Sequence, residues 1–104
     1  MFNILKQFFD KGPAENLNEL FAEGAIVVDV RSKAEFAGGH LPKSINIPLP
    51  QLQNGGLKVQ KDKAIITCCA SGARSATAKR WLESNGYSKV INGGSWLNLR
   101  QYQL

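Results

Sequence analysis

The chain has 104 residues, 43% hydrophobic and 20% charged, with a formal net charge of +5 at pH 7, as expected for a single globular domain over residues 1–104. Lysine and arginine are scattered rather than interleaved with aromatic residues, which argues against nucleic-acid binding, whereas a mildly positive surface suits a small anionic substrate. No apolar run approaches membrane-spanning length, and the two cysteines are adjacent, so we expect a cytoplasmic protein with no membrane contact and no disulfide framework.

The first part of the chain predicts helices followed by a central strand. Residues 1–12 favour an N-terminal extension or a short amphipathic helix, ahead of a core of about residues 14–98. Residues 16–19 resemble a capping box that opens a further helix, and Gly24 is expected to end it. Residues 25–30 form a continuous apolar run, which is typical of a strand covered on both faces.

Short elements are predicted in the middle of the chain. Ser32 and Glu35 have the spacing of a second capping box, which indicates a short helix that the glycines at 38–39 end. Residues 44–47 favour a short strand, and residues 49–63 a loop with one helical turn.

The second half of the chain predicts two strands and two helices. Residues 64–68 favour a buried strand, and residues 76–84 a helix that ends at the Asn-Gly pair of residues 85–86. Val90-Ile91 predicts a last short strand before a glycine pair, and residues 95–104 favour a helix.

This alternation predicts an α/β fold with an open, mostly parallel sheet of four to five strands and helices on both faces. Ligands bind at the carboxyl ends of the strands in such sheets. Asp29, Arg31 and Cys69 each lie at or just beyond the end of a predicted strand. We therefore expect these three residues along the same edge of the sheet.

The strand-to-helix junction at Cys69 has the features of a nucleophile site. Backbone N–H groups converge at such a junction and favour an anion, so we expect the Cys69 thiol to have a lowered pKa. Cys68 precedes it on the strand and should face the opposite side as an inert thiol. The loop residues that follow Cys69 are Ala70, Ser71, Gly72, Ala73 and Arg74. They are small enough to curl around the sulfur, and the arginine adds a positive charge at the rim.

Three ordered segments resemble the signatures of rhodanese domains, in a match that runs from about residue 17 to residue 96. The first covers residues 28–31, 35 and 39–48, the second residues 69–75, and the third residues 85–90 and 93–96. The family usually opens with an edge strand, but residues 13–15 offer no good strand here.

The resemblance implies a rhodanese-like fold and an enzyme similar to single-domain thiosulfate sulfurtransferases, with no cofactor and no metal. Cys69 would take the outer sulfur of a small anionic donor such as thiosulfate as a persulfide. An acceptor such as cyanide or a thiol, including one on a thioredoxin-like protein, would then remove it. Residues 69–74 would form the active-site loop, in which Arg74 orients the donor.

The other signature residues favour supporting roles. Asp29 is expected to accept N–H bonds that fix the end of its strand, and Arg31 to pair with a carboxylate or with carbonyl groups. Glu35 is interpreted as a capping-box residue. His40 is expected to be buried and bonded to the backbone rather than to act as a base, and Trp96 to pack in the core.

Two other functions stay open. Counting from Cys68 gives the Cys-x5-Arg spacing of cysteine phosphatases and arsenate reductases of related type, with Arg74 as the closing arginine, although Thr67 stands where those enzymes usually carry histidine. The second alternative is a non-catalytic rhodanese-like binding module. The mark of such a module would be a lost nucleophile, and Cys69 is present.

Overall fold

A computed structural model describes residues 17–102, and its centre is a sheet of four parallel strands in the order β2-β1-β3-β4. The strands are β1 (Ile26–Asp29), β2 (Ile45–Asn46), β3 (Ala64–Cys69) and β4 (Lys89–Ser95). The predicted α/β fold with a parallel sheet is confirmed, and within residues 17–102 the sheet has the lower of the two expected strand numbers. All four carboxyl ends therefore lie at the same edge.

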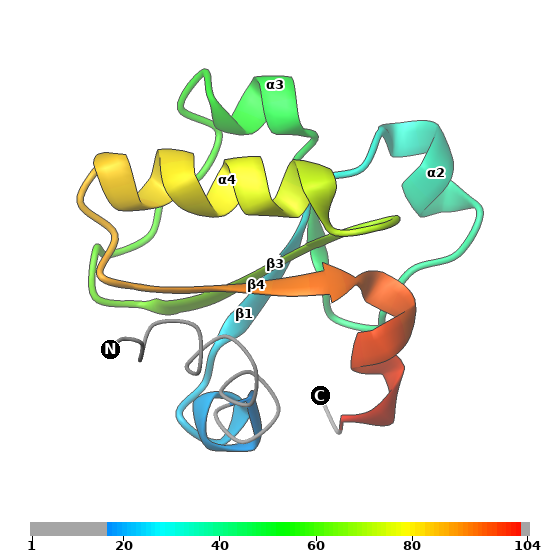
Figure 1. The fold of residues 1–104 in the computed structure, drawn as a ribbon, viewed down its shortest axis with the longest axis horizontal. Helices are drawn as coiled ribbons and strands as arrows, with labels where there is room; N and C mark the ends of the chain where they lie inside the picture. The colour runs from blue at the N-terminus through cyan, green and yellow to red at the C-terminus, as the bar shows by residue number, and fades with distance from the viewer. Residues whose placement is uncertain (1–16, 103–104) are drawn as a thin grey trace, which may run out of the picture.

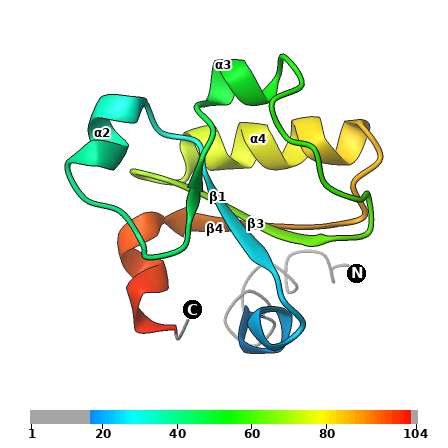
Figure 2. The same ribbon diagram turned by 180° about the vertical axis from the view of Figure 1, so that it is seen from behind.

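Helical segments cover both faces of the sheet, as predicted. They are a segment over residues 17–22, α2 (Lys33–Ala37), α3 (Leu49–Leu52), α4 (Ala73–Ser84) and the 3-10 helix η1 (Trp96–Gln101). Figures 1 and 2 show α3 and α4 above the sheet, and residues 17–22 with η1 below it. The short α2 stands at the carboxyl end of the sheet, beside the loop that follows β3 (Figure 1). No helix among residues 17–102 is long and apolar enough to cross a membrane.

The two central strands are buried on both faces, and their alternating side chains enter two hydrophobic clusters. Val28 and Ile65 belong to the cluster that includes Leu82 of α4, whereas Val27 and Ile66 belong to the cluster that includes Leu99 of η1. The same alternation sends the last two residues of β3 to opposite faces. Cys69 joins the first cluster and Cys68 the second.

The last strand is longer than the sequence predicted. Because glycine weakens strands, the pair at 93–94 was expected to follow a two-residue strand, but β4 continues through it to Ser95. A Cβ at Gly93 would lie 2.8 Å from Ile66 Cγ2 and 2.9 Å from the Thr67 carbonyl oxygen. Gly93 is therefore a requirement of close packing against β3 and not a break.

The other strand boundaries agree with the sequence or shift by one residue, whereas α4 begins at Ala73, three residues before its predicted start. Strand β3 includes Cys69, with an irregularity in its pairing to β4 between Thr67 and Cys69. The first described helix ends at residue 22, and Gly24 in the turn that follows it has φ 92°. The predicted capping box at 16–19 begins outside the described residues, as do the extension at 1–12 and the segment 13–15.

Candidate active site

The sulfur of Cys69 lies inside the loop that joins β3 to α4. The Gly72 N–H donates to Sγ at 3.0 Å and the Ser75 N–H at 3.4 Å. Gly72 has φ 107°, a left-handed conformation that favours glycine, and it is the N-cap of α4. Cys69 is only 1% exposed. Backbone donors at a helix N-terminus therefore surround one buried sulfur, as the sequence predicted.

The two adjacent thiols have opposite pKa shifts. Burial opposes the ionisation of Cys69, but hydrogen bonds from the Ser75 hydroxyl and from the N–H groups of Ser75, Gly72 and Ser71 outweigh it and lower the pKa of this thiol. Burial, and then the nearby charge of Asp29, raise the pKa of Cys68 to about 12. These shifts favour the thiolate at Cys69 and the neutral thiol at Cys68.

Asn92 of β4 organises the same loop, and sequence reasoning missed it. Its Nδ2 donates to the Gly72 carbonyl oxygen at 3.3 Å. Its Oδ1 accepts from the Gly94 N–H at 2.9 Å and from the Ser75 hydroxyl at 2.6 Å. The Ser75 hydroxyl has one hydrogen, so while it donates to Asn92 it accepts from the Cys69 thiol, 3.5 Å away. When the thiol ionises, that hydroxyl can turn to donate to the sulfur.

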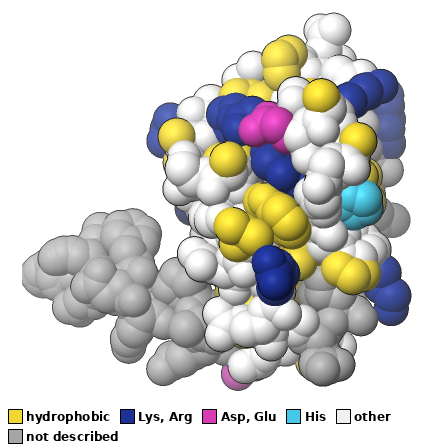
Figure 3. All heavy atoms as spheres, turned by 90° about the vertical axis from the view of Figure 1, so that its right-hand side faces the viewer, with side chains coloured by type: hydrophobic (Ala, Val, Ile, Leu, Met, Phe, Trp, Pro, Cys, Tyr) yellow, Lys and Arg dark blue, Asp and Glu magenta, His cyan; other side chains and the backbone are white. Residues whose placement is uncertain are grey.

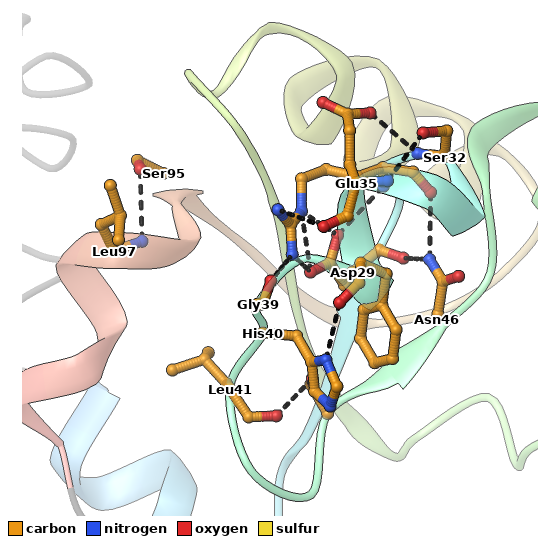
Figure 4. Close-up of polar contacts among 12 residues, drawn as sticks. Asp29, Ser32, Glu35, Gly39, His40, Leu41, Asn46, Ser95 and Leu97 are labelled. Carbon is orange, nitrogen blue, oxygen red and sulfur yellow. Dashed lines mark hydrogen bonds and ion pairs between the residues drawn. The ribbon is translucent and has the colours of Figure 1, made fainter.

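A buried ion pair fixes the end of β1. Arg31 donates to Asp29 from its backbone N–H and from its guanidinium, at 2.8–3.1 Å. The guanidinium also donates to the Gly39 carbonyl oxygen at 2.8 Å and lies 4.7 Å from the centre of the Trp96 ring. Asn46 donates to the carbonyl oxygens of Asp29 and Arg31, both at 3.0 Å (Figure 4). Asp29 and Arg31 have the supporting contacts that the sequence predicted.

Glu35 has two partners, of which the sequence predicted one. The capping box is present, because the Ser32 N–H donates to Glu35 Oε1 at 3.0 Å and the Glu35 N–H donates to Ser32 Oγ at 3.2 Å. In Figure 4 the Glu35 carboxylate points away from Asp29. It accepts two hydrogen bonds from Arg74, at 2.7 and 3.0 Å. The interpretation of Glu35 as a capping residue alone is therefore incomplete, and the positive charge expected at the rim is paired.

His40 is bonded to the backbone, as expected, but it is exposed rather than buried. Its Nδ1 lies 2.8 Å from the Phe36 carbonyl oxygen, and its ring stacks on the Phe36 ring at 3.7 Å (Figure 4). These contacts hold the turn that follows α2. Within residues 17–102, no three His, Cys, Asp or Glu side chains gather as a metal site would require.

The pH dependence of alkylation tests the hydrogen bonds to Cys69. We expect the iodoacetamide rate to rise through a pKa below the ordinary thiol value of about 8.5. Ser75→Ala should shift that profile to higher pH, because it removes a hydroxyl that favours the thiolate. The control is Thr77→Ala, which removes a hydroxyl bonded within α4 to the Ala73 carbonyl. Equal profiles for both variants would contradict the role of Ser75.

The left-handed backbone at Gly72 gives a second test. Gly72→Ala should lower the free energy of unfolding by about 1–2 kcal/mol and should also slow alkylation of Cys69, because strain moves the N–H that contacts Sγ. Gly55→Ala is the matched control, since Gly55 has φ 85° and open space around it. We expect the two variants to lose similar stability, measured by urea unfolding, and only Gly72→Ala to lose thiol reactivity. A normal alkylation rate in Gly72→Ala would be inconsistent with this account.

Comparisons with a family profile and with individual relatives give the same family for this chain. Residues 13–96 match the profile of the rhodanese-like domain. A sulfurtransferase of Allochromatium vinosum is 33% identical over 81 residues, which are 76% of this chain and 76% of the relative. The thiosulfate sulfurtransferase GlpE of Pseudomonas savastanoi pv. phaseolicola is 31% identical over 88 residues, 83% of each chain.

The fold also resembles solved structures. A human single-domain sulfurtransferase superposes with a TM-score of 0.72 at 25% identity, over 86% of this chain and 94% of that one. The family match over residues 13–96 includes the four strands, α2, α3 and α4, and the loop at Cys69.

Proposed function

This chain belongs to the rhodanese-like domain family, and we propose that it is a sulfurtransferase that carries a sulfane sulfur on Cys69. The Cys69 thiolate attacks the outer sulfur of a donor such as thiosulfate. The sulfur–sulfur bond of the donor breaks, and sulfite leaves with the electron pair. An acceptor thiolate or cyanide then attacks the outer sulfur of the Cys69 persulfide and releases the thiolate again. A thiol on a thioredoxin-like protein is one such acceptor.

The observation that supports this proposal most strongly is the convergence of N–H groups on Cys69 Sγ, with Gly72 at 3.0 Å and Ser75 at 3.4 Å. The reaction alternates between a thiolate and a persulfide anion, and both anions need donors that are already in position. The lowered pKa of Cys69 favours the thiolate, which is the nucleophile of the first half-reaction. Neither half-reaction requires a general base, which suits the exposed, backbone-bonded His40.

The geometry gives less support to the phosphatase alternative. Cys68 packs in the cluster on the face of the sheet opposite Cys69, with Leu17, Ile66 and Leu99, and its pKa is about 12. It is therefore poorly placed and poorly ionised as the nucleophile of a Cys68-x5-Arg74 loop. Cys69 itself is 1% exposed, which suits attack on a terminal sulfur atom better than attack on a tetrahedral phosphorus enclosed by oxygens. The binding-module alternative leaves the N–H groups that surround Cys69 Sγ without a role.

Steady-state kinetics test the reaction class. Initial rates of thiocyanate formation, measured while thiosulfate and cyanide are both varied, should give the parallel reciprocal lines of a covalent intermediate between two half-reactions. The same preparation should release no phosphate from a generic aryl phosphate. Phosphate release without thiocyanate formation would overturn the proposal in favour of the phosphatase.

A further inference from the structure

The ion pair between Arg74 and Glu35 involves the last residue of the loop at Cys69, and the charges of Arg74 and Cys69 interact. Arg74 is in the first turn of α4, and Glu35 is in α2, 39 residues earlier. Arg74 Nη1 donates to Glu35 Oε1 at 2.7 Å and Nη2 to Oε2 at 3.0 Å, the two-pronged geometry that is strongest for arginine and carboxylate. Both side chains are partly exposed, at 39% and 37%. Figure 3 looks onto this end of the molecule and shows acidic and basic side chains side by side.

Glu35 is held ready to neutralise Arg74. The Ser32 N–H also donates to Glu35 Oε1 at 3.0 Å, so this oxygen accepts from both Ser32 and Arg74. Arg74 and then Ser32 lower the pKa of Glu35 to about 2, so this carboxyl group is ionised at neutral pH. The buried Arg31 is neutralised in the same way by Asp29. Both of these arginine charges are therefore offset, and the partial charges of backbone N–H groups remain to attract an anion.

We propose that Glu35 is a specificity-determining residue of the Cys69 site, which selects donors with a single negative charge, such as an alkyl persulfide, over dianions such as thiosulfate. This selection between donors rests on the proposed sulfur transfer at Cys69. In both cases the Cys69 thiolate attacks the outer sulfur and the sulfur–sulfur bond of the donor breaks. The electron pair leaves on an alkylthiolate or on sulfite. Approach of a dianion to a thiolate costs about twice the Coulomb energy of approach by a monoanion. Neutralising Arg74 therefore lowers the rate of reaction of a dianion with Cys69 more than that of a monoanion.

The variant Glu35→Gln tests this proposal with little change in structure. Glutamine serves the capping box as glutamate does, so the bond from the Ser32 N–H is kept while the charge is removed. The two donors are thiosulfate and methanethiosulfonate, a monoanion with the same outer sulfur and a sulfinate leaving group. Glu35→Gln should raise kcat/KM by about tenfold for thiosulfate and about threefold for methanethiosulfonate.

A matched control removes the same charge elsewhere. Glu83 pairs with Lys79 at 3.1 Å, further along α4. It lies about 14 Å from Arg74 along the helix axis, which exceeds the screening length of about 10 Å at 0.1 M salt. Glu83→Gln should therefore leave kcat/KM for both donors within about twofold of the value for the parent chain. An equal gain in both variants would show that net charge alone raises the rates, and would overturn the proposal.

A second readout does not depend on sulfur transfer. Iodoacetate is an anion and iodoacetamide is neutral, so the ratio of their alkylation rates at Cys69 reports the potential at the sulfur. Glu35→Gln should raise this ratio about threefold, and an unchanged ratio together with an unchanged donor preference would refute the role of Glu35. A raised ratio in a chain that accepts sulfur from neither donor would support charge control by Glu35 and overturn the proposed sulfur transfer instead.

Discussion

Cys69→Ser should transfer sulfur at less than about one thousandth of the rate of the parent chain, as is typical when a nucleophile is removed. A serine hydroxyl does not ionise at neutral pH and does not form a persulfide. The fold should survive, because the N–H groups of Gly72 and Ser75 can donate to a hydroxyl oxygen as they do to Sγ. The measurement is thiocyanate formation per folded molecule, with folding followed by circular dichroism.

The neighbouring cysteine provides the matched control. Cys68→Ser should keep most of the activity per folded molecule, because the Cys68 side chain packs on the opposite face of the sheet. It should lower the free energy of unfolding by about 1–3 kcal/mol, the cost of burying a hydroxyl among apolar groups. If Cys68→Ser is inactive and Cys69→Ser is active, the loop has the longer spacing and the phosphatase-like function is favoured.

Asp29→Ala should lower the free energy of unfolding by about 3–5 kcal/mol, because it leaves the Arg31 guanidinium buried without its charge partner. The lost hydrogen bonds also release the end of β1, where Asn46 bonds to the backbone. The midpoint and slope of urea unfolding measure this loss. Activity per folded molecule should fall only in part, since Asp29 supports the site through Arg31.

An exposed ion pair provides the comparison for Asp29. Glu83→Ala breaks the pair with Lys79, whose side chains are 31% and 48% exposed, and should cost less than about 1 kcal/mol. A double variant, Asp29→Leu with Arg31→Leu, should recover part of the stability, because no charge is then left unpaired. If Asp29→Ala costs no more than Glu83→Ala, the Asp29–Arg31 pair does not hold the end of β1.

Local sequence patterns were sufficient for most of the elements and for the N–H groups around Cys69. The apolar runs at 25–30 and 64–68 and the capping box at Ser32 depend on neighbours in the chain, and each is present in the structure. Alternation along a strand was enough to separate Cys68 from Cys69. These features follow from backbone geometry, which the sequence determines over a few residues.

Contacts between distant segments were not predictable in the same way. Glu35 satisfies its local pattern completely, so nothing in the sequence indicates that its carboxylate also binds Arg74, 39 residues later. Asn92 gave no motif, although it directly follows the predicted strand of residues 90–91, a position that the sheet-edge rule could have used. Gly93 was interpreted as a strand break because its close approach to Ile66 depends on the register of two strands.

The central claim is that a sulfur atom is carried on Cys69, and mass spectrometry of the chain tests it most directly. After incubation with thiosulfate or an alkyl persulfide and removal of the donor, the intact chain should be heavier by one sulfur atom. Fragmentation of the peptide that contains both cysteines should place that atom on Cys69, and cyanide should remove it. A chain that gains no sulfur from either donor, or that carries the added sulfur on Cys68, would contradict the account.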